Sequence, residues 1–142
     1  MMKPAELLER LRADRKIEVQ VGHITFTGQC PLYSRLIRII NEYSGDKTIS
    51  PDAVMASIAI TGWEGVTERD IIPDGDPDIL VPFDQSLYNE LVMDRMDWWL
   101  NISKAITKSA FDRQVVKEAE IKNSPAGTTT KPSRKSQGQR QS

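Results

Sequence analysis

The chain has 142 residues, of which 39% are hydrophobic and 27% are charged, so it suits one compact domain with a modest apolar core. The net charge is −1, and segment 123–142 holds four basic residues and no acid, so removing those four charges leaves −5 for residues 1–122. No apolar run approaches the roughly 18 residues that cross a bilayer, which excludes a membrane-spanning protein.

Cys30 is the single cysteine, so the sequence excludes an internal disulfide and fits a reducing compartment. The first residues are charged throughout and lack the apolar segment of a signal peptide. We therefore expect a cytoplasmic protein.

Residues Pro4–Asp14 are expected to form a short amphipathic helix. Its apolar face carries Leu7, Leu8 and Leu11. The simpler interpretation is that this face docks on the core of the same chain. The alternative is a partner-binding helix that is loose in the free protein.

Alternating residues predict a β-hairpin at about 17–27. Ile17, Val19 and Val21 point one way in the first strand, and Gly22 and His23 form the turn. A lone hairpin is marginal in water, so it must lie on the rest of the domain.

Two helices are expected next. The first begins near Pro31 and ends at Ser44, with a core-facing stripe of Leu32, Leu36, Ile39, Ile40 and Tyr43. The second runs from a Ser50 N-cap to Thr61. After it, two glycines around Trp63 predict an irregular turn that pins the indole into the core, and 67–78 reads as an exposed loop.

Asp84 is a predicted N-cap, and the spacing of Phe83 and Tyr88 around it is that of a hydrophobic staple. A long helix follows over 94–122, with a kink near Asp97. Trp98 and Trp99 lie about 100° apart on it, so either one is buried and the other is a partner anchor, or both bury against the loop before Val81.

The sequence thus predicts a mainly α fold of the α+β class: a small helical domain with an N-terminal β-hairpin and a disordered C-terminal tail. One domain covers 1–122, and 123–142 is a disordered basic tail without a bulky apolar residue. Trp63, Phe83, Trp98 and Trp99 are the candidate protein-interaction residues.

Residues suited to catalysis are few, so we expect no enzyme and no cofactor. A Cys30–His23 pair would lack an orienting group and an oxyanion site. One Cys and one His cannot build the usual zinc site. The acids at 74–78 begin like a calcium loop but lack its glycine and its final glutamate, so no metal site is expected either.

Three pieces of sequence resemble the tail assembly chaperones of siphophage-type tailed bacteriophages. They are Ile60–Val66 with its Trp-x-Gly-Val core, Val81–Leu87 with its Val-Pro-Phe start, and Lys122-Asn123-Ser124. The resemblance covers about residues 17–124. The chain departs from the family in a long insert between Val66 and Val81, so the packing of Trp63 on Phe83 is not implied.

The resemblance implies a small helical protein of the host cytoplasm that is absent from the finished virion. Such chaperones coat the tape measure protein, keep it soluble and recruit tail tube subunits. Many exist in a short form and a frameshifted long form, and 123–142 would suit the tail of a short form. The sequence leaves open whether the protein is a homo-oligomer.

Two other functions stay open. A structural virion component, such as a head-tail connector or tail terminator, would carry more β-structure and a larger, flatter apolar interface. A small nucleic-acid-associated regulator would need a basic recognition helix, but Glu42 offsets Arg35 and Arg38, and the four tail charges would give only a weak, salt-sensitive contact. The sequence therefore does not favour a nucleic-acid partner.

Overall fold

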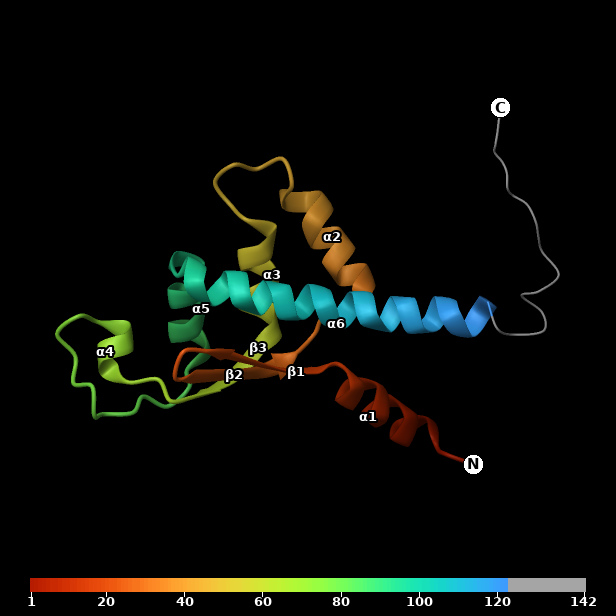
Figure 1. The fold of residues 1–142 in the computed structure, drawn as a ribbon, viewed down its shortest axis with the longest axis horizontal. Helices are drawn as coiled ribbons and strands as arrows, with labels where there is room; N and C mark the ends of the chain where they lie inside the picture. The colour runs from red at the N-terminus through yellow and green to blue at the C-terminus, as the bar shows by residue number, and fades with distance from the viewer. Residues whose placement is uncertain (123–142) are drawn as a thin grey trace. The chain divides into compact units, whose positions relative to one another are not determined.

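The computed structural model describes residues 1–122, with side chains up to Val115. The described part is mainly helical with a three-stranded antiparallel sheet, which confirms the predicted fold class (Figure 1). The predicted disordered tail, 123–142, lies outside the described residues. The elements are α1 (Pro4–Asp14), β1 (Lys16–Val21), β2 (Ile24–Gln29), α2 (Tyr33–Tyr43), α3 (Pro51–Ala59), β3 (Ile60–Glu64), α4 (Glu68–Ile71), α5 (Gln85–Asp94) and α6 (Met96–Lys122).

Contacts between residues divide the chain into two units, Met1–Ala110 and Phe111–Ser142. The boundary falls within α6, and the core and the sheet belong to the first unit. The expectation of one domain over 1–122 stays a prediction. Within the described residues, no helix is long and apolar enough to cross a membrane.

The predicted hairpin is confirmed, with one more residue at its start and two more at its end. Gly22 has a φ of 61°, the left-handed conformation that this turn needs. Val19 pairs with Phe26 across the two strands, and both side chains are buried. The alternation read from the sequence therefore sets which face of the hairpin meets the core.

The region after α3 differs from the prediction. α3 ends at Ala59, and Ile60–Glu64 forms β3, an antiparallel partner of β2, where an irregular turn was expected. Trp63 lies opposite Phe26 in this pairing, and its buried side chain does enter the core as predicted. β2 would otherwise leave one edge of amides and carbonyls unpaired, and β3 satisfies these groups.

The predicted loop at 67–78 contains the short helix α4. The Asp70 carboxylate accepts hydrogen bonds from the Thr67 amide at 2.8 Å and from the Thr67 hydroxyl at 3.0 Å, the arrangement of a capping box. The Val81 amide donates to the Val66 carbonyl at 2.8 Å and closes the base of the segment. The segment between Val66 and Val81 is therefore folded, with a capped helix and a base closed by a backbone hydrogen bond.

The start of α5 confirms the predicted cap. The Asp84 side chain accepts a hydrogen bond from the Leu87 amide at 2.9 Å, and the rings of Phe83 and Tyr88 lie 5.8 Å apart, as a hydrophobic staple requires. The kink expected near Asp97 is a complete break of the helix two residues earlier. The helix breaks at Arg95, whose extended backbone ends α5 and whose side chain donates to the Asp70 carbonyl at 2.7 Å.

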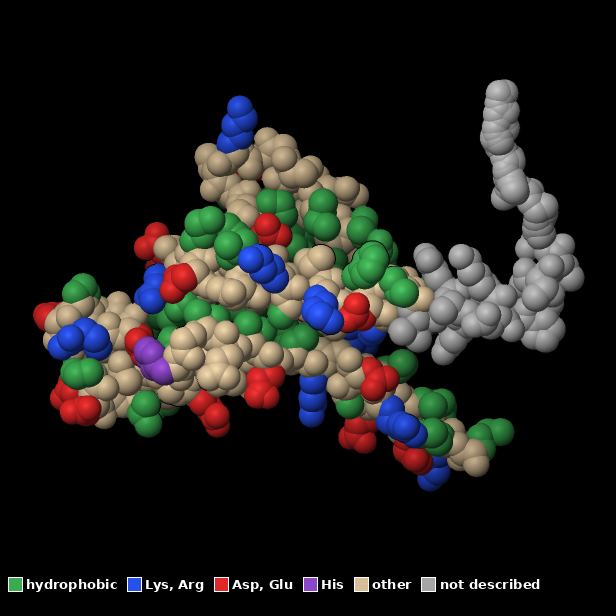
Figure 2. Space-filling model, in the orientation of Figure 1, with side chains coloured by type: hydrophobic (Ala, Val, Ile, Leu, Met, Phe, Trp, Pro, Cys, Tyr) green, Lys and Arg blue, Asp and Glu red, His purple; other side chains and the backbone are tan. Residues whose placement is uncertain are grey.

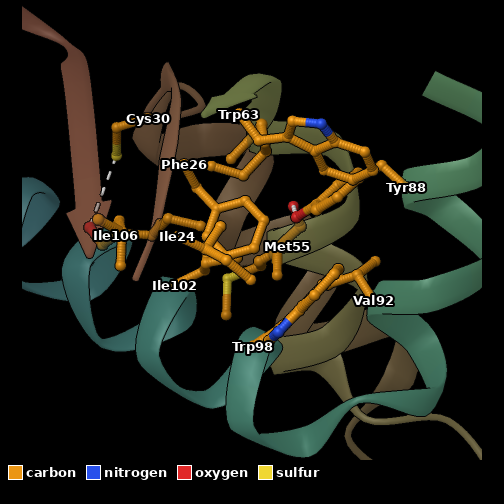
Figure 3. Close-up of a cluster of buried hydrophobic side chains, with 14 of the residues drawn as sticks. Ile24, Phe26, Cys30, Met55, Trp63, Tyr88, Val92, Trp98, Ile102 and Ile106 are labelled. Carbon is orange, nitrogen blue, oxygen red and sulfur yellow. Dashed lines mark hydrogen bonds between the residues drawn. The ribbon is translucent and has the colours of Figure 1, made fainter. Parts of the chain in front are cut away.

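The core joins one face of the sheet to the helices (Figure 3). The Phe26 ring lies 5.0 Å from that of Trp98 and 6.0 Å from that of Tyr88. The Tyr88 hydroxyl donates to the Ala56 carbonyl at 2.7 Å, and burial raises the pKa of Tyr88 well above its ordinary value. Each large side chain buried here contributes about 1.5–3 kcal/mol.

Candidate protein-interaction surfaces

The structure brings three of the four predicted interaction residues together. The Trp63 ring lies 5.1 Å from that of Phe83 and 6.2 Å from that of Trp98. Trp63 is 7% exposed and Trp98 is 1% exposed, so both are core residues and leave little surface for a partner. The Trp63 indole N–H donates to the Val81 carbonyl at 2.8 Å, which ties the two ends of the insert together.

Trp99 lies apart from this cluster. It is partly exposed and lines a hollow of about 350 Å³ with Tyr43, Met93 and the segment that joins α2 to α3. Of the two interpretations of the tryptophan pair, the one with a buried and a partly exposed member is correct. A contact role for Phe83 and Trp99 stays a prediction.

The helix α1 has an apolar face that nothing in the described chain covers. No residue of α1 is buried, and Leu7, Leu8 and Leu11 are 47%, 47% and 57% exposed. The expectation that this face docks on the core is therefore wrong. In Figure 1 α1 lies beyond the end of the hairpin, and Figure 2 shows hydrophobic side chains open to solvent along it. We name these three leucines the leucine face.

The exposure of the leucine face is consistent with the way α1 is attached to the rest of the chain. Hydrogen bonds to its C-terminal end hold it: the Gln29 side chain donates to the Arg12 carbonyl and the Cys30 amide to the Arg15 carbonyl, each at 2.6 Å. These bonds fix one end of the helix without burying its leucines. Isolated helices of this length are marginal in water, so a partner that covers the leucine face would stabilise α1.

The helix α2 has two apolar faces, and the amino-acid pattern predicted only the buried one. Leu36 and Ile39 are buried, as predicted. Tyr33, Ile37 and Ile40 are 48%, 37% and 41% exposed, and we name them the α2 stripe. Leu32 and Ile40 were expected to face the core, but they are 55% and 41% exposed. No role was predicted for Tyr33 and Ile37. Their spacing of i, i+4 and i+7 was the signal, since it marks a second helical face.

The two residues considered for nucleophilic chemistry lie at opposite ends of β2. His23 Nε2 lies 2.8 Å from Asp70 Oδ2, while the Cys30 thiol is buried and donates to the Ile106 carbonyl at 3.5 Å (Figure 3). The six residues of β2 separate them by roughly 20 Å. A Cys–His pair is therefore excluded by distance.

Two acidic side chains in the segment between Val66 and Val81 accept hydrogen bonds from backbone amides. Asp76 accepts a hydrogen bond from the Asp78 amide at 2.8 Å, and Asp70 caps α4. Among the described residues, no group of three or more His, Cys, Asp or Glu side chains could hold a metal ion. Asp70 and Asp76 thus have a structural role in cap and turn hydrogen bonds.

Replacing Asp70 with asparagine should make stability less dependent on acid pH. Burial alone would raise the pKa of Asp70, but hydrogen bonds from the Thr67 amide, His23 and the Thr67 hydroxyl outweigh it and lower the pKa. The stabilisation is therefore complete above the ordinary pKa of an aspartate and is lost as the pH falls toward the lowered folded-state pKa.

We expect the D70N variant to lose about 1 kcal/mol of unfolding free energy near neutral pH. The gap to the parent protein should close as the pH falls below the ordinary pKa of an aspartate and the Asp70 carboxylate of the parent becomes protonated. Urea denaturation across this range measures the gap, with the exposed Asp74→Asn change as control. A gap that stays constant across the acid range would contradict this assignment.

No protein family, curated protein or solved structure matches the chain. The resemblance to phage tail assembly chaperones therefore stays a prediction. The leucine face and the α2 stripe are two helix surfaces of the described chain whose large apolar side chains stay exposed.

Proposed function

We propose that this protein is a phage tail assembly chaperone that binds the tape measure protein and recruits tail tube subunits in the host cytoplasm. The sequence resemblance of Ile60–Val66, Val81–Leu87 and 122–124 suggests the family. The observation that carries a binding function is the leucine face, an amphipathic helix surface of which no residue is buried.

An uncovered leucine face is suited to an apolar client. Burying a fully exposed leucine side chain contributes about 1.5–3 kcal/mol. Leu7, Leu8 and Leu11 are 47%, 47% and 57% exposed, so covering them contributes roughly half of that each, which is enough for a reversible complex. A long helical client offers many such contacts in series, and an assembly chaperone must release each of them when the tail tube forms. Moderate contacts repeated along a client suit this cycle better than one large interface.

The alternative of a structural virion component is less well supported. A permanent assembly interface buries a large and flat apolar area. The leucine face and the α2 stripe are narrow helix faces with three large side chains each. The sheet, the element expected to be larger in a tail terminator, has three strands in the described residues.

Co-expression with the tape measure protein of the same phage tests the proposal. We expect the intact protein to move the tape measure protein into the soluble fraction. The triple variant L7S/L8S/L11S should lose this effect, because it removes about 3 kcal/mol or more of apolar contact, about a hundredfold in affinity. Its own unfolding midpoint should hardly change, since these leucines are not buried.

A matched control comes from the insert. Ile72, Ile79 and Leu80 are also exposed, and the variant I72S/I79S/L80S removes as many apolar side chains elsewhere on the molecule. It should keep full solubilising activity. A tape measure protein that stays insoluble beside the intact protein, together with the presence of this chain in purified virions, would favour the structural alternative and overturn the proposal.

A further inference from the structure

We propose that the leucine face binds an amphipathic helix whose apolar stripe is flanked by acidic side chains. This inference rests on the proposed function, because it names the chemistry of the client segment that this surface binds. It also makes a claim of its own, since a client could be bound through its apolar side chains whatever charges lie beside them.

Two arginines border the leucine face on opposite sides. Successive residues of an α-helix are about 100° apart around its axis, which places Arg10 and Arg12 each roughly 100° from the middle of the leucine face, one on either side. By the same geometry, Glu6 and Glu9 lie roughly 150° from it, on the back of the helix. We name Arg10 and Arg12 the arginine rim. A helix laid along the leucines therefore meets both arginines, while the two glutamates point away from it.

The arginine rim is accessible to a partner. Both side chains are exposed, and neither takes part in an ion pair among the described residues. The Arg10 guanidinium lies 3.6 Å from the sulfur of Met2, a neutral acceptor that leaves its charge uncompensated. The two positive charges of the rim are therefore available to carboxylates of a partner.

The charges around the leucine face are positive on balance. Asp14 is the one acid of α1 near the face, roughly 70° from its middle. Lys3 and Arg15 stand at the two ends of the helix as its N-cap and C-cap residues. On the strand that follows, the charges of Lys16 and Glu18 cancel. Together with the arginine rim, this leaves four positive charges against one negative charge, which acidic side chains beside an apolar stripe would complement.

Arg15 gives a second indication that is independent of this count. It follows Leu8 by seven positions and Leu11 by four, so it continues the line of the leucine face at the C-terminal end of α1. Its Nε is buried and has no hydrogen-bond partner among the described residues. A buried donor without an acceptor is costly, and a carboxylate accepts a strong, charge-assisted bond from a guanidinium. An acidic side chain of a partner helix that extends past Leu11 would give this group its acceptor.

A membrane or a nucleic acid suits the same surface less well. Either one is a broad anionic surface that responds to the whole of α1, and Pro4–Asp14 holds two arginines and three acids, a net charge of −1. A nucleic acid would also leave the leucines without a contact. A second copy docked leucine face to leucine face would bring two arginine rims together, and like charges repel. A partner helix covers only a narrow strip of α1, so it meets the rim without the acids behind it.

Two synthetic helical peptides test the inference with the full-length protein. Both carry leucine at i, i+3, i+4 and i+7, and they differ only in having glutamate or lysine at the positions that flank this stripe. Fluorescence anisotropy should show that the glutamate peptide binds about tenfold more tightly. Raising sodium chloride from about 50 mM to about 500 mM should reduce this preference, because the arginine rim is exposed. Vesicles of phosphatidylglycerol should not sediment the protein.

Two matched variants separate the arginine rim from the overall charge of α1. R10Q/R12Q removes two charges beside the leucine face, and E6Q/E9Q removes two charges from the back of the same helix. We expect R10Q/R12Q to bind both peptides about equally, and E6Q/E9Q to keep the preference of the parent protein within about twofold.

A third variant assigns the binding to the leucine face. L7S/L8S/L11S should bind neither peptide measurably, because it removes the apolar contact on which both depend. All three variants should keep the unfolding midpoint of the parent protein in circular dichroism, since no residue of α1 is buried. Equal binding of the peptides by the parent protein, no binding of either, a preference that survives in R10Q/R12Q, or sedimentation with the vesicles would each overturn the inference.

The outcome is separable from that of the co-expression test. If the glutamate peptide is preferred as expected but the tape measure protein stays insoluble, the acid-flanked partner stands and the chaperone function falls. If the tape measure protein becomes soluble while the two peptides bind equally well, the chaperone function stands and the acid-flanked partner falls.

Discussion

Replacing Trp98 with alanine is expected to lower the free energy of unfolding by about 4 kcal/mol. The indole is 1% exposed and lies edge-on to Phe26, with the ring centres 5.0 Å apart. Removing it leaves a cavity between α6 and the strands β2 and β3. We expect these elements to be unable to move together far enough to fill it. Small domains are stable by about 5–15 kcal/mol, so the loss is a large part of the total.

The same substitution also releases a charged group. The Arg95 guanidinium lies over the Trp98 ring, 4.5 Å from its centre, and the Arg95 side chain bonds to the Asp70 carbonyl. A cation over an aromatic face contributes about 0.5–1 kcal/mol where it is exposed. Loss of Trp98 therefore weakens the link between α6 and the insert as well as the core.

Urea denaturation followed by circular dichroism measures this effect, since removing a tryptophan also changes the fluorescence signal. Trp99→Ala is the matched control, because it removes the same side chain from the next, partly exposed position. We expect it to cost less than about 2 kcal/mol. Equal losses for the two variants would show that Trp98 is not the central packing residue of the fold.

The features that the sequence predicted well depend on neighbouring residues. The bounds of α1 follow from its amphipathic pattern, and the turn of the hairpin follows from Gly22. The cap of α5 follows from the spacing of Asp84, Phe83 and Tyr88. In each case the residues that decide the conformation lie within a few positions of one another, so no knowledge of the rest of the fold is needed.

The features that were missed depend on distant partners. β3 forms because β2, more than 30 residues earlier, offers a free edge to Ile60–Glu64. An amphipathic pattern shows that a face such as that of α1 needs cover, but not whether the cover comes from the same chain. Likewise, the choice between Trp98 and Trp99 depends on where Arg95 breaks the helix, a position that no strong stop signal marks.

The candidate interaction surfaces also differ in how far neighbouring residues predict them. The leucine face could be found from the spacing of Leu7, Leu8 and Leu11, and only its exposure had to come from the structure. The α2 stripe was not predicted, because apolar residues on two faces of one helix give the same sequence pattern as a single broad face that packs on the core. Trp63 and Trp98 were named as candidate interaction residues, yet both are buried, because the largest side chains are also those that a small core buries.

Replacing Gly28 with alanine is expected to cost about 3 kcal/mol, at the upper end of overpacking effects. The pairing of β2 with β3 shifts register between Thr27 and Gly28. A Cβ added at Gly28 would meet the Ala59 carbonyl oxygen and would lie 2.8 Å from the Ile60 Cα. Both are backbone atoms, so no side-chain rotation can relieve the contact.

In the G28A variant, we expect the pairing of β2 with the start of β3 to be disturbed, which is the contact that the sequence did not predict. To admit the methyl group, the start of β3 must move away from β2, which strains the pairing that places Trp63 opposite Phe26. Gly45→Ala is the control, because a Cβ there would meet nothing within 4 Å, and it should stay within about 0.5 kcal/mol of the parent protein. Urea denaturation compares the two variants. If G28A were as stable as G45A, β3 would not pack against β2 as closely as described, and the register that brings Trp63 into the core would be wrong.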